Sequence, residues 1–599
     1  MSTTGGSGYV IPPRLWRWAG TRRAAAAFLW LVTLATAAHH LWHARTWFND
    51  RPIFAEPTRR HDGNNGHAQI DFGGQWVMGR MVARGFGREL YHRQRQWEVA
   101  RDGFHPRWEQ PAVAEELFTP KYERKWFKPG DDVRHDADWM MYWFMGTDPP
   151  EWSKLGGAVA LPIAAPPGDP LSALALQHTG ASAVTPELVE ALRKPAIGGP
   201  LYPPVQGFLY APLALDDNPQ RSYAIFQCVG LALVFVAGLG VKVLSRGRIW
   251  WSAACLGILM YPGCRTGLDL AQNPTMSLAI LVWGWALASR GREFGGGLVW
   301  GLFVFKPTWG MAFFLVPLLT RRWKMAAAMV ATGGLVAAAT LPVVGLQAWF
   351  DWLAVGKEAA ALYDVNKNWI HLSRDLQGIP RRMLMDFELP ESERARPVIT
   401  RLAWGLWATV FAGTAAVYLL RGNRRNATGL GAGFLFLGAY MTCYRFMYYD
   451  VLLSAAAFAV LLADPRKVLR PRPVALVPVD PPPDPAGPRW TGYVNSFPLT
   501  IFALLILVDS VGVGLKVEAT IGFGYFERVV PSGGSTGVVT PKVSGDTSSN
   551  YPLDAFLLLA LWVWCAWRLW RDGDNLTAAV QESPTSAGGV LPPSGSHRH

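Results

Sequence analysis

The 599 residues are 50% hydrophobic and only 17% charged, and they include 29 Trp, 29 Phe and 17 Tyr. This balance argues against a soluble globular protein and favours a polytopic membrane protein, because Trp and Tyr collect at both bilayer interfaces. The formal net charge of +13 is explained if Lys and Arg lie in cytoplasmic loops. No nucleic-acid-binding motif accompanies the basic charge, so we expect no nucleic acid partner.

The chain begins with a basic tail over residues 1–23, which we predict to be cytoplasmic. The apolar run over 24–42 approaches the length of a membrane span, and we interpret it as a retained first transmembrane helix. A cleaved signal peptide is the alternative, because Ala-Thr-Ala at 35–37 is typical of a cleavage site. Both interpretations place the Trp-, Pro- and Gly-rich segment 43–220 outside, as an extracytoplasmic loop or domain.

That outer segment contains a predicted helix over 71–85, which Asp71 opens. Phe72, Trp76 and Gly79 recur at helical spacing, so the helix is expected to be amphipathic and to lie in the membrane interface. Asp is a favoured N-cap residue, and capping alone could explain Asp71. A carboxylate held at the edge of a bilayer is also a candidate for chemistry.

The next apolar runs predict a helical transmembrane core over 221–465. If the spans alternate in direction, every flanking basic cluster falls on one side, which the positive-inside rule requires. The expected spans are 222–241, 249–263, 274–289, 325–344, 398–420, 428–443 and 450–463.

The stretch 294–320 is different, because basic residues flank both of its ends. It is too short to cross a bilayer twice as full helices. Lys306-Pro307 lies at its middle, and Pro breaks a helix, so we predict a re-entrant or tilted hairpin with Lys306 near its tip.

The C-terminal part is predicted to contain a Pro-rich cytoplasmic linker over 466–495, a transmembrane hairpin over 496–570 and a disordered tail over 571–599. The whole chain is therefore expected to be an all-α, multi-pass protein of the cell membrane with both termini in the cytoplasm. The five cysteines show no CxxC pair, which argues against a zinc site or a disulfide framework. One bridge, between Cys264 and Cys443, remains possible.

This topology collects polar side chains at the outer face. Amides and phenols bind sugar hydroxyls, whereas Lys and Arg bind phosphate. Moving a sugar from a lipid phosphate also needs a general base for the proton of the acceptor hydroxyl, and one carboxylate can fill that role. The collected residues are Asp71, Tyr202, Asp269, Gln272, Asn273, Lys306, His371, Arg374, Arg445, Tyr449 and Asp450.

Several short motifs occur in a fixed order with spans between them. They are Asp71-Phe72 to Gly85 with Leu90-Tyr91, Tyr202-Pro203-Pro204, Tyr210-Ala211-Pro212-Leu213, Gln272-Asn273, Lys306-Pro307 and Arg321-Arg322-Trp323. In this order they resemble glycosyltransferase family 87, membrane enzymes of the GT-C fold that include polyprenyl-phosphate-mannose-dependent mannosyltransferases. The chain departs from the family in the long segment 92–201, in an additional C-terminal hairpin and in Ala271, where Gly is usual. Near Asp450 many members carry a His, where this chain has Tyr448-Tyr449-Asp450.

The resemblance implies a GT-C-like helical bundle that transfers a hexose, by default mannose, from a polyprenyl phosphate to an extracytoplasmic glycan or lipid acceptor. It implies that the donor enters sideways from the membrane lipid, and no cofactor or metal is expected. Asp71 would be the catalytic base. The expected substrate-binding residues are Gln272, Asn273, Lys306, Arg445, Tyr449, Asp450, His371 and Tyr202, with Lys306 and Arg445 on the leaving phosphate.

Simpler roles remain open for these residues. Lys306 and Arg445 could extend to water from the membrane, and Gln272 or Asn273 could cap the helix that follows. His39 and His43 share a helix face but have no third ligand at metal-binding spacing. At the level of the whole protein, the alternatives are a transporter or flippase of lipid-linked sugars and a non-catalytic envelope scaffold.

Overall fold

The computed structural model describes residues 19–47, 67–92, 95, 96, 99, 200–463, 496–509 and 552–572, apart from single positions 218, 366, 388 and 390. The described chain consists of helices and turns, and one isolated β-bridge joins Ser373 to Met447. Five of its helices are long and apolar enough to cross a membrane. These are α1 (Ala19–Trp42), α12 (Pro219–Leu244), α18 (Trp323–Val344), α23 (Pro397–Arg421) and α29 (Leu553–Asp572). The prediction of an all-α polytopic membrane protein is therefore confirmed.

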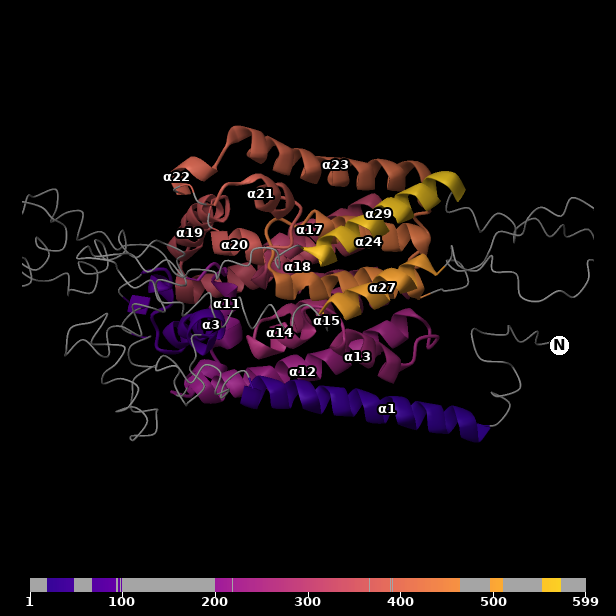
Figure 1. Cartoon of the computed structure of the whole chain (residues 1–599). Coiled ribbons are helices and arrows are strands. Elements are labelled where there is room, and N and C mark those ends of the chain that lie inside the picture. The colour runs from indigo at the N-terminus through magenta and orange to yellow at the C-terminus, as the bar shows by residue number, and fades with distance from the viewer. Residues whose placement is uncertain are drawn as a thin grey trace, which may run out of the picture.

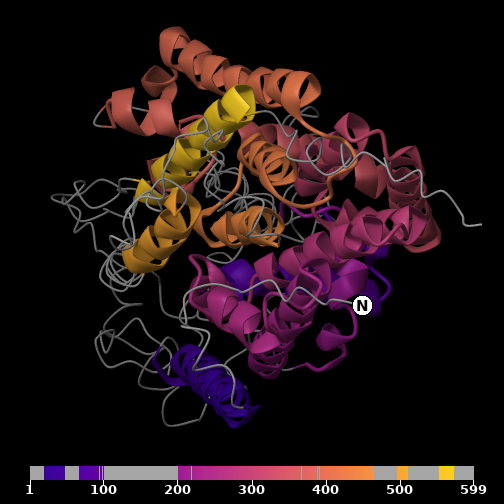
Figure 2. The ribbon, with the colours of Figure 1, turned by 90° about the vertical axis from the view of Figure 1, so that its right-hand side faces the viewer.

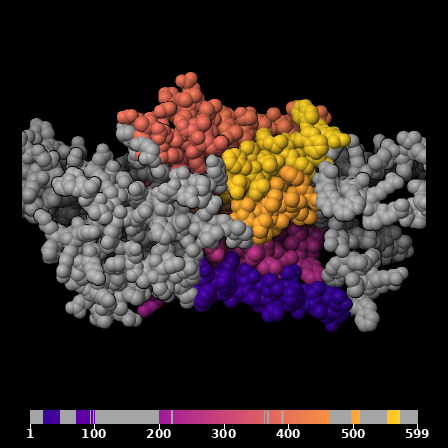
Figure 3. All heavy atoms as spheres, viewed as in Figure 1, coloured from indigo at the N-terminus to yellow at the C-terminus, as the bar shows by residue number. Residues whose placement is uncertain are grey.

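Shorter apolar helices pack among the long ones. They are α13 (Trp251–Leu259), α15 (Pro274–Ser289), α16 (Glu293–Gly301) with the 3₁₀ turn η7 (Leu302–Phe305), α17 (Pro307–Leu319), α24 (Leu430–Met441), η8 (Tyr448–Ser454) with α25 (Ala455–Leu462), and α27 (Phe497–Val508). Figures 1 and 2 show α1 at one edge of the bundle and α23 at the opposite edge. On the face seen in Figure 3, α27 and α29 cover the surface between α23 and α13.

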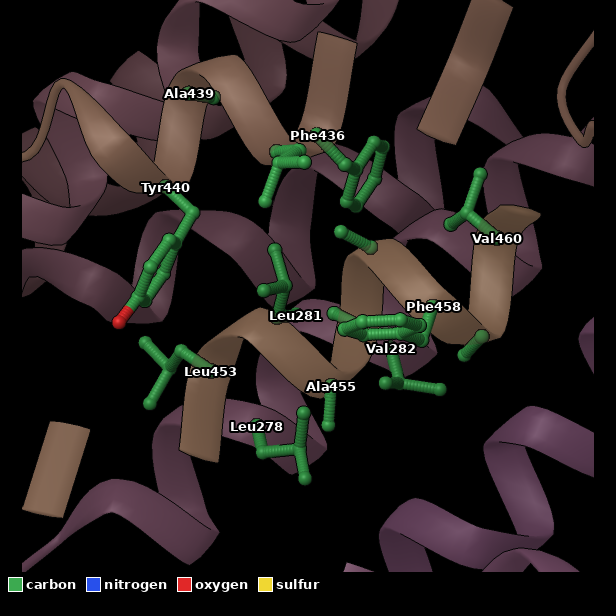
Figure 4. Packing of buried hydrophobic residues seen from close by; sticks show 14 of the residues in the cluster. Leu278, Leu281, Val282, Phe436, Ala439, Tyr440, Leu453, Ala455, Phe458 and Val460 are labelled. Carbon is green, nitrogen blue, oxygen red and sulfur yellow. The ribbon is translucent and has the colours of Figure 1, made fainter. Parts of the chain in front are cut away.

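Helix α15 lies at the centre of the bundle, and its bounds coincide with the predicted span 274–289. It is apolar on all sides because neighbours surround it, whereas a surface helix keeps one polar face. Leu278, Leu281 and Val282 pack against α24 and α25 (Figure 4). This packed centre holds the start of α15, where Asn273 lies, in a fixed place.

The predicted span 249–263 is shorter in the structure, because α13 ends at Leu259 and a separate helix, α14 (Cys264–Asp269), follows. Gly263 between them has φ +83°, and a Cβ built on it would lie 2.3 Å from the carbonyl oxygen of Tyr449. Only Gly fits such a turn and such a close approach. In the stretch 294–320, by contrast, the predicted break at Lys306-Pro307 is confirmed, since η7 ends there and Pro307 starts α17.

Helix α3 (His67–Ala83) corrects two predictions. Asp71 is its fifth residue, so Asp71 does not open the helix as an N-cap. Every residue from Phe72 to Met81 is buried, so α3 is not an amphipathic helix lying on the membrane interface. It packs against α11 (Val205–Tyr210) and α12.

The bundle has two distinct ends (Figure 1). One, which we call the α3 end, carries α3, η4 (Gly87–Glu89), α11, η6 (Leu213–Leu215), α14, α19 (Gln347–Tyr363), α20 (Lys367–Leu372), α21 (Gly378–Leu384) and α22 (Glu391–Arg394), and the π-helical turn η2 (His43–Trp47) follows α1 there. At the other end, Arg290 donates to the carbonyl oxygen of Val243 and Arg322 pairs with Glu293. The basic clusters at the ends of α12, α15 and α17 therefore lie together, as the alternating spans predict.

Candidate functional site

Lys306 lies at the break between η7 and α17, and its side chain is only 13% exposed. Its Nζ lies 2.6 Å from Oδ1 of Asp450 and 3.3 Å from Oδ1 of Asn273. The same atom lies 5.6 Å from the ring centroid of Tyr449. Three residues predicted to bind substrate therefore surround Lys306, although they come from chain segments far apart in sequence.

Buried amides extend this contact toward α3. Asn273 donates from Nδ2 to Oε1 of Gln75 at 3.4 Å, and Gln75 donates from Nε2 to Oε1 of Gln272 at 3.5 Å. Gln206 also donates to Oε1 of Gln75. The hydroxyl of Tyr202 donates to Oε1 of Gln272 at 2.8 Å. We call this set the amide–lysine network: Gln75, Tyr202, Gln206, Gln272, Asn273, Lys306 and Asp450.

The turn between α14 and α15 presents Gln272 and Asn273 to this network. Asn273 occupies the N-cap position of α15, yet its side chain makes no capping hydrogen bond. The capping role considered for Asn273 is therefore wrong. Ala271, the preceding residue, has φ +45° in the left-handed region, where Gly is far better tolerated. This backbone requirement explains why Gly suits the position.

One further contact joins two segments that flank the site. The hydroxyl of Tyr91 donates to the carbonyl oxygen of Tyr202, so the Leu-Tyr and Tyr-Pro-Pro motifs meet across about a hundred intervening residues. Burial, with a smaller contribution from Asp351, raises the pKa of the Tyr91 phenol well above its ordinary value. The phenol therefore remains a donor at physiological pH.

Asp71 lies one helical turn before Gln75 on α3, by the positions of their backbones. Sequence reasoning identified Asp71 but missed Gln75 and Gln206, which are both fully buried. In the sequence, the only signal for Gln75 is that it is a polar residue one helical turn, four positions, after Asp71. For Gln206 it is proximity to the Tyr-Pro-Pro motif, two residues after Pro204.

Arg445 and His371 belong to a second group, the arginine cluster, formed by α20, α21 and the turn after α24. Arg445 and Arg381 both pair with Asp364, the latter at 2.8 Å. His371 is 7% exposed and its ring lies 4.9 Å from that of Phe387. The contacts described for these two predicted substrate-binding residues are thus made within the arginine cluster.

Further ion pairs and hydrogen bonds in the arginine cluster are made to groups of the protein itself. Arg374 pairs with Asp554 at 2.9 Å and donates to the backbone carbonyls of residues 371–373. Burial and the neighbouring Arg445 lower the pKa of Arg381, and Asp364 partly opposes them. These side chains join the loop between α18 and α23 to the turn at Arg445 and to the start of α29.

The remaining candidates form no metal site in the described ranges. Nδ1 of His43 lies 3.2 Å from Oδ1 of Asp269, and both residues are buried. Among the described residues no group of three or more His, Cys, Asp or Glu side chains is placed to hold a metal ion. Cys264 and Cys443 are both free, so the bridge considered between them is not formed.

The amide–lysine network combines one cation, one carboxylate and several amides in a buried setting. Amides and phenols can exchange hydrogen bonds among themselves for bonds to hydroxyl groups, because they both donate and accept. A Lys ammonium can bind a phosphate oxygen as a point charge. The arrangement is therefore suited to a ligand that carries both hydroxyls and an anionic group.

Residues 201–469 match the model of a family described as glycosyltransferase family 87. This range contains the network residues from Tyr202 to Asp450, whereas α3 with Gln75 precedes it. The predicted resemblance is thereby confirmed. No curated protein matches the chain, and no solved structure matches it.

Proposed function

We propose, from the match of residues 201–469 to glycosyltransferase family 87, that the chain is a membrane glycosyltransferase that moves a hexose, by default mannose, from polyprenyl phosphate to an extracytoplasmic glycan or lipid acceptor. One observation carries the proposal: Lys306, a cation at a helix break, contacts both Asp450 and the amide chain that begins at Asn273. A side chain that can bind phosphate therefore adjoins side chains that can bind hydroxyls, which supports a role in transfer from a sugar phosphate.

In the proposed reaction, the carboxylate of Asp71 takes the proton of the acceptor hydroxyl. The acceptor oxygen forms a bond to C1 of the hexose, while the bond from C1 to the phosphate oxygen breaks. The departing phosphate keeps that electron pair and leaves as polyprenyl phosphate, so no oxidant, reductant or metal is needed for the balance. Lys306 would stabilise the charge that grows on the phosphate oxygen, which is usually a large contribution to catalysis.

The other network residues would orient the reactants. Gln272, Asn273 and Tyr202 would bind sugar hydroxyls, and Tyr449 would lie beside the sugar because its ring already lies beside the ammonium of Lys306. Asp450 would hold Lys306 in place when no donor is bound, since Nζ and Oδ1 are 2.6 Å apart. The polyprenyl tail would remain in the bilayer, and the donor would approach from the side.

The test uses the purified full chain and a panel of polyprenyl-phosphate sugars, with release of polyprenyl phosphate as the readout. We expect release with at least one donor, and we expect Asp71→Asn to reduce it by about 100-fold or more, as loss of a general base does. Asp216→Asn is the matched control, because Asp216 is a carboxylate at the same end that pairs with Arg221; it should retain full turnover.

The possible outcomes separate the alternatives. Equal turnover of wild type and Asp71→Asn would remove Asp71 as the base but leave the transferase. Absence of release with every donor would overturn the proposed function and favour a lipid-linked sugar transporter or a scaffold.

A further inference from the structure

We propose that Gln75 is a positioning residue that fixes α3 against the substrate-binding turn at Gln272 and Asn273, an inference that rests on the proposed function. Its role is to set the distance between the base on α3 and the phosphate-binding Lys306. Gln75 precedes the residues 201–469 that match the family. It lies within the segment from Asp71-Phe72 to Gly85 but is not one of the residues by which that segment resembles the family.

The first argument is that Gln75 lies at a branch point of the network. Its side chain is fully buried, and both ends of its amide are used. Oε1 accepts from Gln206 and Asn273, and Nε2 donates to Gln272. A buried polar network whose bonds are made holds one arrangement of its elements, because each broken bond would leave a desolvated polar atom.

The second argument concerns the backbone around Gln75. Gly79, one turn later on α3, crosses α11 so closely that a Cβ on it would lie 2.6 Å from the backbone carbon of Tyr210. Gly207 makes the reciprocal approach, since its Cβ would lie 2.8 Å from a methyl carbon of Val82. This crossing brings Gln75 to Gln206. Apolar packing thus fixes α3 against α11, and Gln75 adds the bonds to the turn at Asn273.

The third argument follows from helical spacing. Positions 71, 75 and 79 recur every four residues, so they share one face of α3. The same turn that binds Gln75 also binds Lys306 through Asn273. Gln75 therefore connects the helix of the proposed base, through Asn273, to the cation proposed for the phosphate. Misplacement of reacting groups by about 1 Å can lower a rate by about 100-fold.

The test replaces Gln75 with Met, which keeps the length of the side chain and removes its hydrogen bonds. We expect kcat to fall by about 10- to 100-fold, while the KM for the lipid donor stays near that of wild type. Ser222→Ala is the matched control: it removes another buried hydrogen bond at the α3 end, from Ser222 Oγ to the carbonyl oxygen of Leu213 at 2.7 Å. It should lower stability without lowering kcat.

A double substitution separates positioning from general stability. If Gln75 acts through the turn, Gln75→Met and Gln272→Met should cause less loss together than the product of their separate losses. Three results would each overturn the inference without affecting the proposed transferase: an unchanged kcat in Gln75→Met, losses of kcat in the double variant that equal the product of the single losses, or a loss of kcat in Ser222→Ala as large as that in Gln75→Met. An inactive wild type would instead overturn the proposed function, and this inference with it.

Discussion

The amide–lysine network and the arginine cluster lie at the same end of the bundle, and their polar groups are used differently. In the first, one ammonium and one carboxylate meet a chain of amides. In the second, Arg374, Arg381 and Arg445 bind carboxylates and backbone carbonyl oxygens of the protein itself. Because guanidinium groups bind several acceptors in a fixed plane, they suit the cross-linking of loops. Amides and Lys can exchange protein partners for those of a substrate.

The short segment between Cys443 and Asp450 connects the two clusters. Arg445 on this segment joins the arginine cluster, and Asp450 joins the amide–lysine network. Between them, the ring of Phe446 packs on Trp309 and Tyr440. The arginine cluster therefore holds the loop from which Asp450 reaches Lys306. The arginine cluster thus stabilises this loop, whereas the amide–lysine network is the site that we propose binds the substrate.

The largest expected effect comes from Lys306→Met. Loss of the ammonium should reduce turnover by about 100-fold or more, as removal of one charge-stabilising group does. It also leaves the carboxylate of Asp450, 2% exposed, without its partner, which should cost about 3–5 kcal/mol of stability. Turnover per folded molecule and thermal unfolding measure the two effects separately.

A second substitution distinguishes chemistry from folding at this pair. Lys306→Met combined with Asp450→Asn removes both charges, so stability should recover in large part. Turnover should remain low, because the cation is still absent. Recovery of turnover in the double variant would show that Lys306 serves the structure alone.

The next largest effect is expected for Gly79→Ala, which tests the crossing beneath the network. The added Cβ meets the backbone of Tyr210 at 2.6 Å, and backbone cannot rotate away as a side chain can. We expect a loss of about 1–3 kcal/mol in stability from overpacking, with lower turnover because α3 shifts. Gly405→Ala is the control, since a Cβ on Gly405 would meet nothing within 4 Å; it should stabilise α23 slightly.

Arg445→Met tests the other cluster. It removes the ion pair to Asp364 and a hydrogen bond to the carbonyl oxygen of Tyr363. We expect a loss of about 1–3 kcal/mol in stability, typical of hydrogen bonds to a charged group, and toward the lower value because Asp364 is 37% exposed. The KM for the lipid donor should not change. A large rise in that KM would place Arg445 on the phosphate, as the sequence predicts.

Sequence predicted the fold best where one local signal determines an element. A continuous apolar run defined α15, and Pro307 marked the break at Lys306. The prediction failed where a contact between residues far apart in the sequence determines where a helix begins or ends. The span after residue 249 ends early because Gly263 packs on the backbone of Tyr449. Asp71 looked like an N-cap, yet α3 extends back to His67.

Only part of the site could be predicted, because contacts between distant segments also determine which side chains meet there. The motifs supplied Tyr202, Gln272, Asn273 and Lys306, and the predicted topology supplied Asp450; the structure brings these residues into one network. Residue type could not separate Arg445 from these, because its partner Asp364 lies 81 residues earlier in the chain. Gln75 follows Asp71 at helical spacing, but that spacing does not show what the buried amide contacts; only the packing of α3 does.

The smallest expected change in stability comes from relieving backbone strain at a single residue. Each of the two clusters has one residue with a strained backbone in it or beside it. Ala271 has φ +45° beside the amide–lysine network, and Arg445 has φ +56° in the arginine cluster. A left-handed conformation costs a non-Gly residue about 1–2 kcal/mol, so Ala271→Gly should raise stability by up to about 1 kcal/mol after the entropy of Gly is deducted. Turnover should not change, because Ala271 contributes no polar group to the network.

The control for this substitution is Ala254→Gly, in the middle of α13. There the backbone is helical, so Gly should lower stability by about 1 kcal/mol. If thermal unfolding shows that Ala271→Gly raises stability and Ala254→Gly lowers it, the turn requires the backbone conformation at position 271 and not the side chain of Ala271. If both substitutions destabilise the protein, contacts of the Ala271 methyl group outweigh the strain, and Gly is not the better residue before Gln272 in this chain.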